Sequence, residues 1–293
     1  MEKFNVHCKD AIKEALALNK APRHITGENV YQIADERVLK VIDEKITKDL
    51  LLPESYLTGI EHLNALYEKA CGGASCLLMC EHYSNMDLPI ISYLIRQAGG
   101  ENIAASLLAI AGMKLNEDDA AMAVFSSAFT RIIICPSKQA QSIDPEKDKE
   151  EKLRILNINR CAMKKLDEVK KEGKIVLLFP SATRYRPWDP SSRNVQREID
   201  SYVKGFDYLC FASLNGEIMH IHQGEMIEDT VSNDLIIITV SPMQVCAEFR
   251  QKIREKCEKN GIEDKKQAVA DEITKTLLTM HEEAELIRQK KLG

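Results

Sequence analysis

The chain has 293 residues, of which 44% are hydrophobic and 29% are charged, and its formal net charge is −5. This length and composition suit a soluble protein with one large domain, or a domain with a smaller appendage. The acidic balance and the lack of a basic stripe with interleaved aromatic residues argue against nucleic acid as a partner. No apolar run reaches the roughly 18 residues of a membrane-spanning helix, so we expect at most contact with a membrane surface.

The nine cysteines are an odd number and are scattered along the chain. This usage is typical of reduced thiols in a cytosolic protein, and the first residues do not resemble a signal peptide. The expected location is therefore cytoplasmic, with peripheral contact at the membrane as the alternative. Cys71, Cys76 and Cys80 precede His82 closely, which raises the question of a zinc site. They lack a paired C-x-x-C spacing, and Cys76 and Cys80 would share one face of a strand as core thiols do, so no metal is predicted.

Residues 1–73 predict a small helical N-terminal domain. Apolar residues between Val30 and Ile46 recur near helical spacing among charges. Prolines at positions 22 and 53 interrupt the pattern, and the last helix of this segment should end at Gly72-Gly73.

From residue 74 to 293 the pattern changes to alternating strands and helices. We expect strands over 75–80, 104–110, 131–135, 174–179, 208–214 and 235–240, and helices over 87–98, 117–128, 146–172, 192–204, 244–259 and 263–291. Such alternation favours an α/β fold with a mostly parallel mixed sheet flanked by helices.

One polar turn stands out, because a histidine follows the first strand and a carboxylate opens the next helix. His82 and Asp87 lie five positions apart at the carboxyl end of that strand, the edge where open α/β sheets place reactive groups. An imidazole can take a proton from an alcohol, and a carboxylate fixes its tautomer and stabilises the charge it gains. The alternative is that Asn85 or Asp87 caps the helix, with His82 an ordinary turn residue.

Two further stretches carry cations just after predicted strands. Arg184 and Arg186 follow the strand at 174–179 within a turn between prolines, and Lys138 follows the strand at 131–135. Guanidinium groups bind phosphate oxygens well, although an isolated arginine pair or a loop lysine is more often simply solvated.

No protein nucleophile accompanies these residues. Ser84 and Ser181 lack a G-x-S-x-G context, and no glycine-rich phosphate loop is present. A base without a nucleophile indicates direct transfer of a group to a bound hydroxyl.

The order and content of these blocks resemble the glycerolipid acyltransferases. The similarity lies in His82-x4-Asp87, in the strand that begins at Arg131, and in the run from Phe179 to Arg184, and it covers roughly residues 74–245. The Pro-Ser-x-x-Arg-x-Arg-Pro pattern and the helical N-terminal segment are most similar to the soluble, plastid-type glycerol-3-phosphate 1-acyltransferases.

This resemblance implies an acyltransferase domain over 74–293 that moves an acyl group from acyl-CoA or acyl-carrier protein to the sn-1 hydroxyl of glycerol 3-phosphate. His82 would be the base oriented by Asp87, while Arg184 and Arg186, with Lys138, would bind the phosphate. No further cofactor is implied. Ala182 departs from the glycine usual in the family, and a proline usual in the last block is missing near Ala212. A lysophosphatidate acceptor, or a non-catalytic member that binds lipid, remains an alternative.

Overall fold

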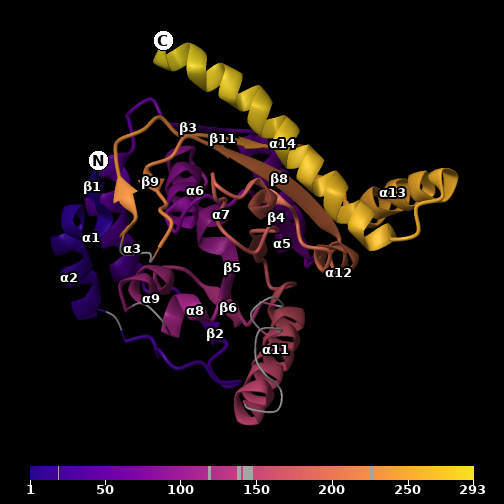
Figure 1. Cartoon of the computed structure of the whole chain (residues 1–293), viewed down its shortest axis with the longest axis horizontal. Coiled ribbons are helices and arrows are strands. Elements are labelled where there is room, and N and C mark those ends of the chain that lie inside the picture. Colours follow the sequence, from indigo (N-terminus) through magenta and orange to yellow (C-terminus); the bar gives the residue numbers. More distant parts are fainter. Residues whose placement is uncertain (19, 118–119, 137–139, 141–147, 225–227) are drawn as a thin grey trace.

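The central sheet is built around β4 (Cys76–Cys80), which directly precedes the histidine turn (Figure 1). The structure is a computed structural model that describes residues 1–18, 20–117, 120–136, 140, 148–224 and 228–293. The sheet has nine strands. Eight follow the order β2 (Tyr31–Gln32), β6 (Arg131–Ile134), β5 (Leu107–Gly112), β7 (Ile175–Leu178), β4, β8 (Tyr208–Asn215), β11 (Ile237–Val240) and β3 (Tyr56–Thr58), and β12 (Gln244–Val245) pairs with β8.

Strand direction confirms the predicted mostly parallel mixed sheet. The five strands from β6 to β8 in this order run parallel, whereas β2 pairs antiparallel with β6, and β11 pairs antiparallel with β8 and parallel with β3. The carboxyl ends of β5, β6, β7 and β4 therefore lie along one edge, which is where the predicted site residues follow their strands.

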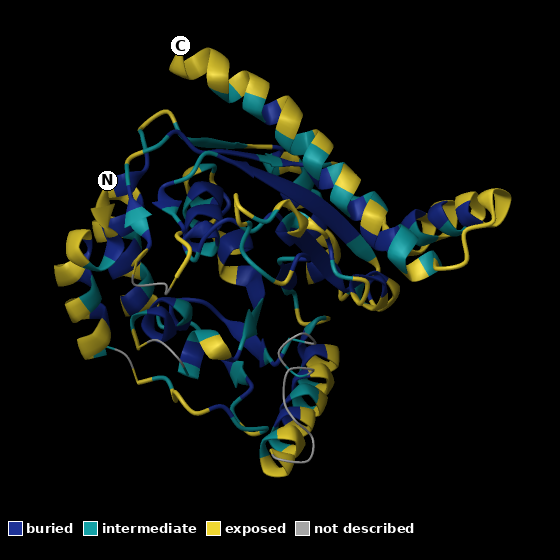
Figure 2. Ribbon diagram, in the orientation of Figure 1, coloured by how far each residue is buried: buried dark blue, intermediate teal, exposed yellow. Residues whose placement is uncertain are grey.

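Alternation along β4 divides the apolar core into two layers. Cys76, Leu78 and Cys80 belong to one hydrophobic cluster, and Leu77 and Met79 belong to the other. Because successive side chains of a strand point to opposite faces, a fully apolar strand needs helices on both sides. Figure 2 shows the sheet as a buried layer between helices with exposed outer faces.

The helices of the first layer are α1 (Phe4–His7), α2 (Lys9–Leu18), α3 (Glu36–Ile42), α4 (Lys48–Leu50), α5 (Ile60–Cys71), α6 (Asp87–Gln97), α7 (Glu101–Ser106) and α9 (Ala120–Ser127). Those of the second are α11 (Lys149–Val169), α12 (Ile199–Lys204), α13 (Cys246–Asn260) and α14 (Lys265–Leu292). Short elements complete the chain: α8 (Lys114–Glu117), a π-helical turn at Asp43–Thr47, a 3-10 turn at Pro190–Arg193, and a small antiparallel sheet of β1 (Glu2–Lys3), β10 (Thr230–Val231) and β9 (Met219–His220).

Residues 1–73 are largely helical, but they also supply two strands of the main sheet. β2 lies at one end of the strand order and β3 at the other. Both strands are short and lack an alternating apolar pattern, so the sequence offered little sign of them. Apolar residues of this segment also share the first core layer with β4 and α6. The division into a helical domain over 1–73 and a second domain over 74–293 stays a prediction.

Two predicted elements differ from the structure. The strand expected over 104–110 begins at Leu107, because the Gly99-Gly100 turn is followed by the short helix α7, which buries Ile103 and Ala104. The helix expected over 192–204 begins only at Ile199, after the 3-10 turn that Asp189 caps through the Ser191 amide.

The nine cysteines are all free, and Cys76 and Cys80 are buried in the core as expected for structural thiols. Within the described ranges, no helix combines the length and apolar character needed to cross a membrane.

Candidate active site

His82 and Asp87 form a hydrogen-bonded pair. His82 Nδ1 lies 2.8 Å from Asp87 Oδ2, and a carboxylate oxygen only accepts, so Nδ1 carries the hydrogen and Nε2 faces away from the pair. The Asp87 side chain is 1% exposed and that of His82 is 18% exposed. The acid is thus inside the protein and the base is at its boundary.

The turn between the two residues is closed by the Asp87 carboxylate rather than by a helix cap. Asp87 accepts hydrogen bonds from the backbone amides of Tyr83 (2.6 Å) and Ser84 (3.0 Å) and from the Ser84 hydroxyl. The N-cap residue of α6 is Met86, which makes no side-chain cap hydrogen bond. The capping alternative for Asp87 is therefore wrong. The short turn itself places the hydrogen-bonded Asp87 carboxylate against His82.

The loop after β7 holds the other side of His82. The Phe179 ring stacks on the imidazole with centroids 4.2 Å apart and planes at 17°. The Tyr185 amide donates to the His82 carbonyl over 2.7 Å. Among the described residues, His82 Nε2 has no hydrogen-bond partner, so this nitrogen is available to a ligand.

A cavity of about 310 Å³ opens beside His82. Small-molecule sites in proteins begin at about 300 Å³, so the space is sufficient for part of a ligand. Its wall is mainly apolar and comes from the ends of β5, β6 and β7 and from α11 and α12; the residues include Ile110, Ile134, Met163, Leu178, Phe179, Ala182, Ile199 and Tyr202. Burial raises the pKa of the Tyr202 hydroxyl to about 12, so the wall stays uncharged there at neutral pH.

Arg184 is partly committed to a carboxylate. Its Nη1 donates to Asp229 Oδ2 over 2.6 Å, and Asp229 is 2% exposed. Asp229 also accepts from the His222 amide through its side chain and from the Phe4 amide through its carbonyl. No second partner of the Arg184 guanidinium lies among the described residues, so its remaining N–H groups can still bind an anion.

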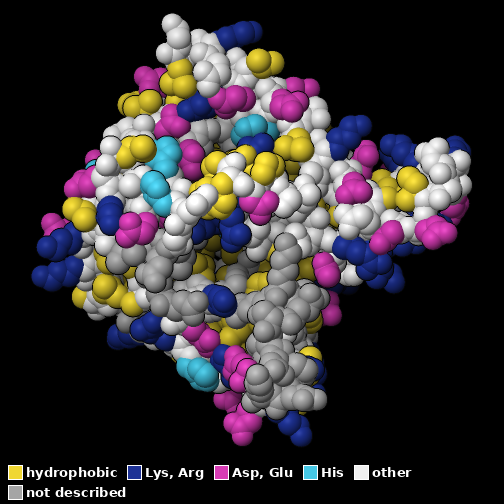
Figure 3. Space-filling model, in the orientation of Figure 1, with side chains coloured by type: hydrophobic (Ala, Val, Ile, Leu, Met, Phe, Trp, Pro, Cys, Tyr) yellow, Lys and Arg dark blue, Asp and Glu magenta, His cyan; other side chains and the backbone are white. Residues whose placement is uncertain are grey.

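Of the other two predicted cations, the structure describes Arg186 but not Lys138. Arg186 is exposed, and its backbone amide donates to the Ser192 hydroxyl, so its side chain is available to solvent or to a ligand. Lys138 lies outside the described residues. Figure 3 shows Lys and Arg side chains beside a hollow in the middle of the face that it presents.

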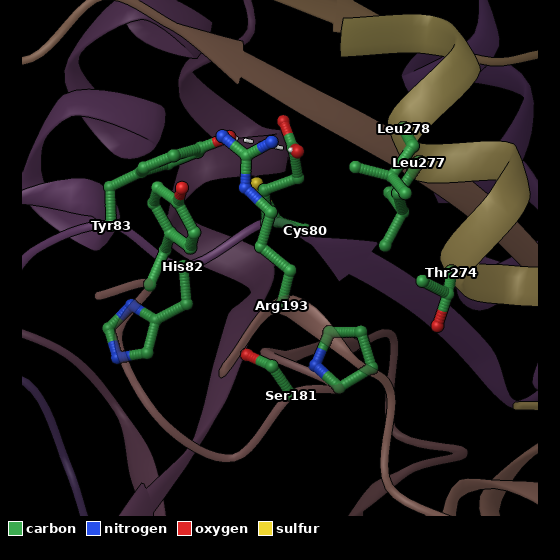
Figure 4. Close-up of a pocket in the computed structure, with 11 residues that line it drawn as sticks. Cys80, His82, Tyr83, Ser181, Arg193, Thr274, Leu277 and Leu278 are labelled. Atoms are coloured by element: carbon green, nitrogen blue, oxygen red, sulfur yellow. Dashed lines mark hydrogen bonds between the residues drawn. The ribbon is translucent and has the colours of Figure 1, made fainter. Parts of the chain in front are cut away.

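Behind His82, a polar cluster that the sequence did not reveal joins the turn to the C-terminal helix. Glu81 and Tyr83 flank His82 in sequence, and the Tyr83 hydroxyl donates to Glu81 (3.0 Å). His281 of α14 lies 2.9 Å from the Glu81 carboxylate, and Arg193 donates to the Tyr83 hydroxyl. Figure 4 shows the His82 ring directed away from the Tyr83 and Arg193 side chains.

Ala182 occupies a backbone conformation that favours glycine. Its φ of 56° lies in the left-handed region, which costs an alanine roughly 1–2 kcal/mol. Ala182 is therefore a point of local backbone strain at the cavity wall.

Among the described residues, no group of three or more His, Cys, Asp or Glu side chains is arranged to hold a metal ion. The sequence matches no protein-family model, and no curated protein shows significant similarity to it.

Proposed function

We propose that the protein is an acyltransferase that moves a fatty acyl group from a thioester, acyl-CoA or acyl-carrier protein, to the sn-1 hydroxyl of glycerol 3-phosphate. The observation that carries this proposal is the His82–Asp87 pair, with Nε2 available, beside an apolar cavity. The resemblance of the ordered sequence blocks supplies the substrate class, and the geometry supports the chemistry.

His82 acts as a general base in this reaction. Its Nε2 removes the proton of the acceptor hydroxyl as the oxygen attacks the thioester carbonyl, and the new C–O bond forms. The C–S bond then breaks, and the imidazolium returns its proton to the departing thiolate. The buried Asp87 carboxylate stabilises the imidazolium between these two proton transfers.

The two substrates occupy different sides of His82. The cavity suits the acyl chain, because most of its lining is aliphatic or aromatic, although Asn159, Gln196 and Glu198 also line it. The phosphate of the acceptor suits Arg184 and Arg186, whose loop is joined to His82 through the Tyr185 amide. Asp229 offsets part of the charge of Arg184, so we expect the exposed Arg186 to contribute substantially to anion binding.

The decisive experiment measures acyl transfer by the purified protein with palmitoyl-CoA and palmitoyl-acyl-carrier protein as donors. Glycerol 3-phosphate and lysophosphatidate serve as separate acceptors, and His82→Ala is the negative control. We expect a 1-acyl product with glycerol 3-phosphate and none with the His82 variant.

Transfer only to lysophosphatidate would overturn the acceptor but keep the mechanism. Absence of transfer with all four donor–acceptor pairs would overturn the proposal and favour a non-catalytic lipid-binding protein. Equal transfer by His82→Ala would remove His82 from the role of base.

A further inference from the structure

The C-terminal helix contacts both sequence neighbours of His82. Glu81 and Tyr83 lie on either side of His82 in sequence, and their side chains meet at His281 of α14, 200 residues from Glu81. The His281 and Tyr83 rings also stack with centroids 5.7 Å apart. An element far along the chain therefore reaches the two residues that flank His82 in sequence.

Glu81 is buried and its carboxylate is well supplied with donors. Oε1 accepts from the Tyr83 hydroxyl, and Oε2 accepts from the Leu214 amide of β8 over 3.1 Å. His281 Nδ1 is 2.9 Å from Oε2, and because a carboxylate only accepts, this nitrogen carries a hydrogen. Without that donor the buried carboxylate would lose one of three hydrogen bonds, two of which tie it to other elements.

Tyr83 completes the cluster. Its hydroxyl accepts from Arg193 Nη2 over 3.2 Å, and the Arg193 guanidinium also lies over the Tyr185 ring at 3.9 Å. Burial and the neighbouring Glu81 charge raise the pKa of the Tyr83 hydroxyl well above its usual range, so it stays a neutral donor to Glu81. Tyr185 is the residue whose amide holds the His82 carbonyl, so the cluster also supports the second contact of the turn.

The space around this cluster differs from the space in front of His82. The cavity bounded by Tyr83, Arg193 and Leu277 of α14 measures only about 20 Å³, enough for about one water molecule. The front cavity measures about 310 Å³. Packing thus leaves His82 little free space beside Tyr83 and Arg193 and much more space in the larger cavity.

We propose that His281 is a positioning residue for His82, acting through Glu81 and Tyr83, so that the C-terminal helix belongs to the active-site framework. The inference rests on the proposed acyl transfer for its kinetic test, but its structural test is independent of activity. A displacement of about 1 Å at a reacting group can cost up to about 100-fold in rate, and His281 touches neither substrate nor the reacting atoms.

Two substitutions at one position separate positioning from simple packing. His281→Phe keeps an aromatic ring and removes the Nδ1 donor. His281→Asn keeps a donor close to the place of Nδ1 and removes the ring. The control is Arg288→Met, which breaks contacts of α14 with the Leu235 carbonyl and Asp234 but leaves the residues around His82 intact.

The first measurement is the Nδ1–H signal of His82 in the ¹H–¹⁵N spectrum of ¹⁵N-histidine-labelled protein, assigned by its loss in His82→Gln. We expect a hydrogen-bonded signal in the intact protein, in His281→Asn and in Arg288→Met, and a shifted or exchange-broadened signal in His281→Phe. An unchanged signal in a folded His281→Phe protein overturns the inference, whether or not the protein transfers acyl groups.

The second measurement is the kinetics of acyl transfer. We expect kcat to fall roughly 10- to 100-fold in His281→Phe with an acceptor KM within about twofold, and to recover at least in part in His281→Asn. A loss of kcat in Arg288→Met as large as in His281→Phe would mean that helix stability alone is responsible, and would reject a positioning role. Should the intact protein lack transfer activity, the proposed function fails and the spectrum alone decides the role of His281.

Discussion

The turn after β4 and the loop after β7 lie at the same edge of the sheet, but they gain their order in different ways. In the turn, base and acid are five residues apart and Asp87 satisfies the local amides as well as His82. In the loop, Arg184 depends on Asp229, which is 45 residues further along the chain. The turn is therefore set by local geometry and the loop by tertiary structure.

The comparison also shows where rigidity is needed. In the proposed reaction the base must hold its direction through two proton transfers, and the partner of His82, Asp87, is buried and close in sequence. The proposed phosphate-binding role requires less rigidity, and Arg186 is exposed. The predictions below test this division, beginning with the largest expected effect.

Replacement of His82 by alanine should affect activity far more than stability. General-base catalysis contributes roughly 10²–10⁴-fold, so we expect kcat/KM for acyl transfer to fall by about this factor. Asp87 retains its bonds to the Tyr83 and Ser84 amides, so the melting temperature should change little. His62→Ala is the matched control, since His62 Nδ1 bonds to the Val240 carbonyl on a different part of the sheet. Equal losses in both variants would contradict a specific role for His82.

Replacement of Asp87 by asparagine should destabilise the turn itself. An amide group has one acceptor oxygen where the carboxylate has two, and four hydrogen bonds from three residues converge on this buried group. Loss of charge-assisted bonds of this kind costs about 1.5–3 kcal/mol, measurable by urea unfolding. Asp167→Asn, at an exposed carboxylate on α11, should stay within about 0.5 kcal/mol of the original protein. A stable Asp87→Asn protein would show that the turn does not depend on this carboxylate.

Substitutions of the two loop arginines should have different effects: that of Arg184 should lower stability, and that of Arg186 should weaken substrate binding. Arg184→Gln leaves Asp229 buried without its cation, and because Arg184 is itself about one-fifth exposed, we expect a loss of about 1–2 kcal/mol. The double variant with Asp229→Asn should recover part of that loss, as a double-mutant cycle measures. Arg186→Gln should leave stability unchanged and raise the KM for glycerol 3-phosphate. An unchanged KM in both variants would remove the pair from phosphate binding.

The parts of the fold that could be predicted are those with a strong local signal. The apolar runs of β4, β7 and β8 predicted strands, and the amphipathic pattern of α11 predicted a helix. The alternation of such elements indicated a parallel sheet. The His82–Asp87 pair was predictable for the same reason, since its geometry is contained in one turn. β2 and β3 were missed because two- and three-residue strands have no periodicity to detect.

The parts of the site that the sequence did not reveal depend on contacts between residues far apart in the chain. Glu81 and Tyr83 could have been noticed as residues flanking His82, but nothing in the sequence links them to His281. Likewise, Asp229 gives no local sign that it will pair with Arg184. Phe179 was visible as the end of a strand, whereas its stacking on His82 required the neighbouring positions of β7 and β4.

A smaller effect is expected at Ala182, in the loop. Glycine adopts the observed positive φ without steric cost, while it loses more chain entropy on folding than alanine. The net result should be a gain of about 0.5–1 kcal/mol in the free energy of unfolding of Ala182→Gly. Ala74→Gly, at a residue outside the left-handed region, should not stabilise the protein. A destabilised Ala182→Gly variant would show that the loop does not hold its strain in solution.

The smallest effect concerns the small sheet that brings Asp229 to Arg184. His220 of β9 lies 3.4 Å from Glu217, and the hydrogen bond with Glu217 raises the pKa of His220 above its usual 6.5. A raised pKa in the folded state means that the pair stabilises the fold below about pH 6.5 and that this contribution disappears as the pH rises through the folded-state pKa. The two side chains are about one-third exposed, so the contribution should be well under 1 kcal/mol. Glu217→Gln should therefore lower the melting temperature slightly at pH 6 and hardly at pH 9. A difference that is the same at both values would mean that the pair does not couple to the protonation of His220.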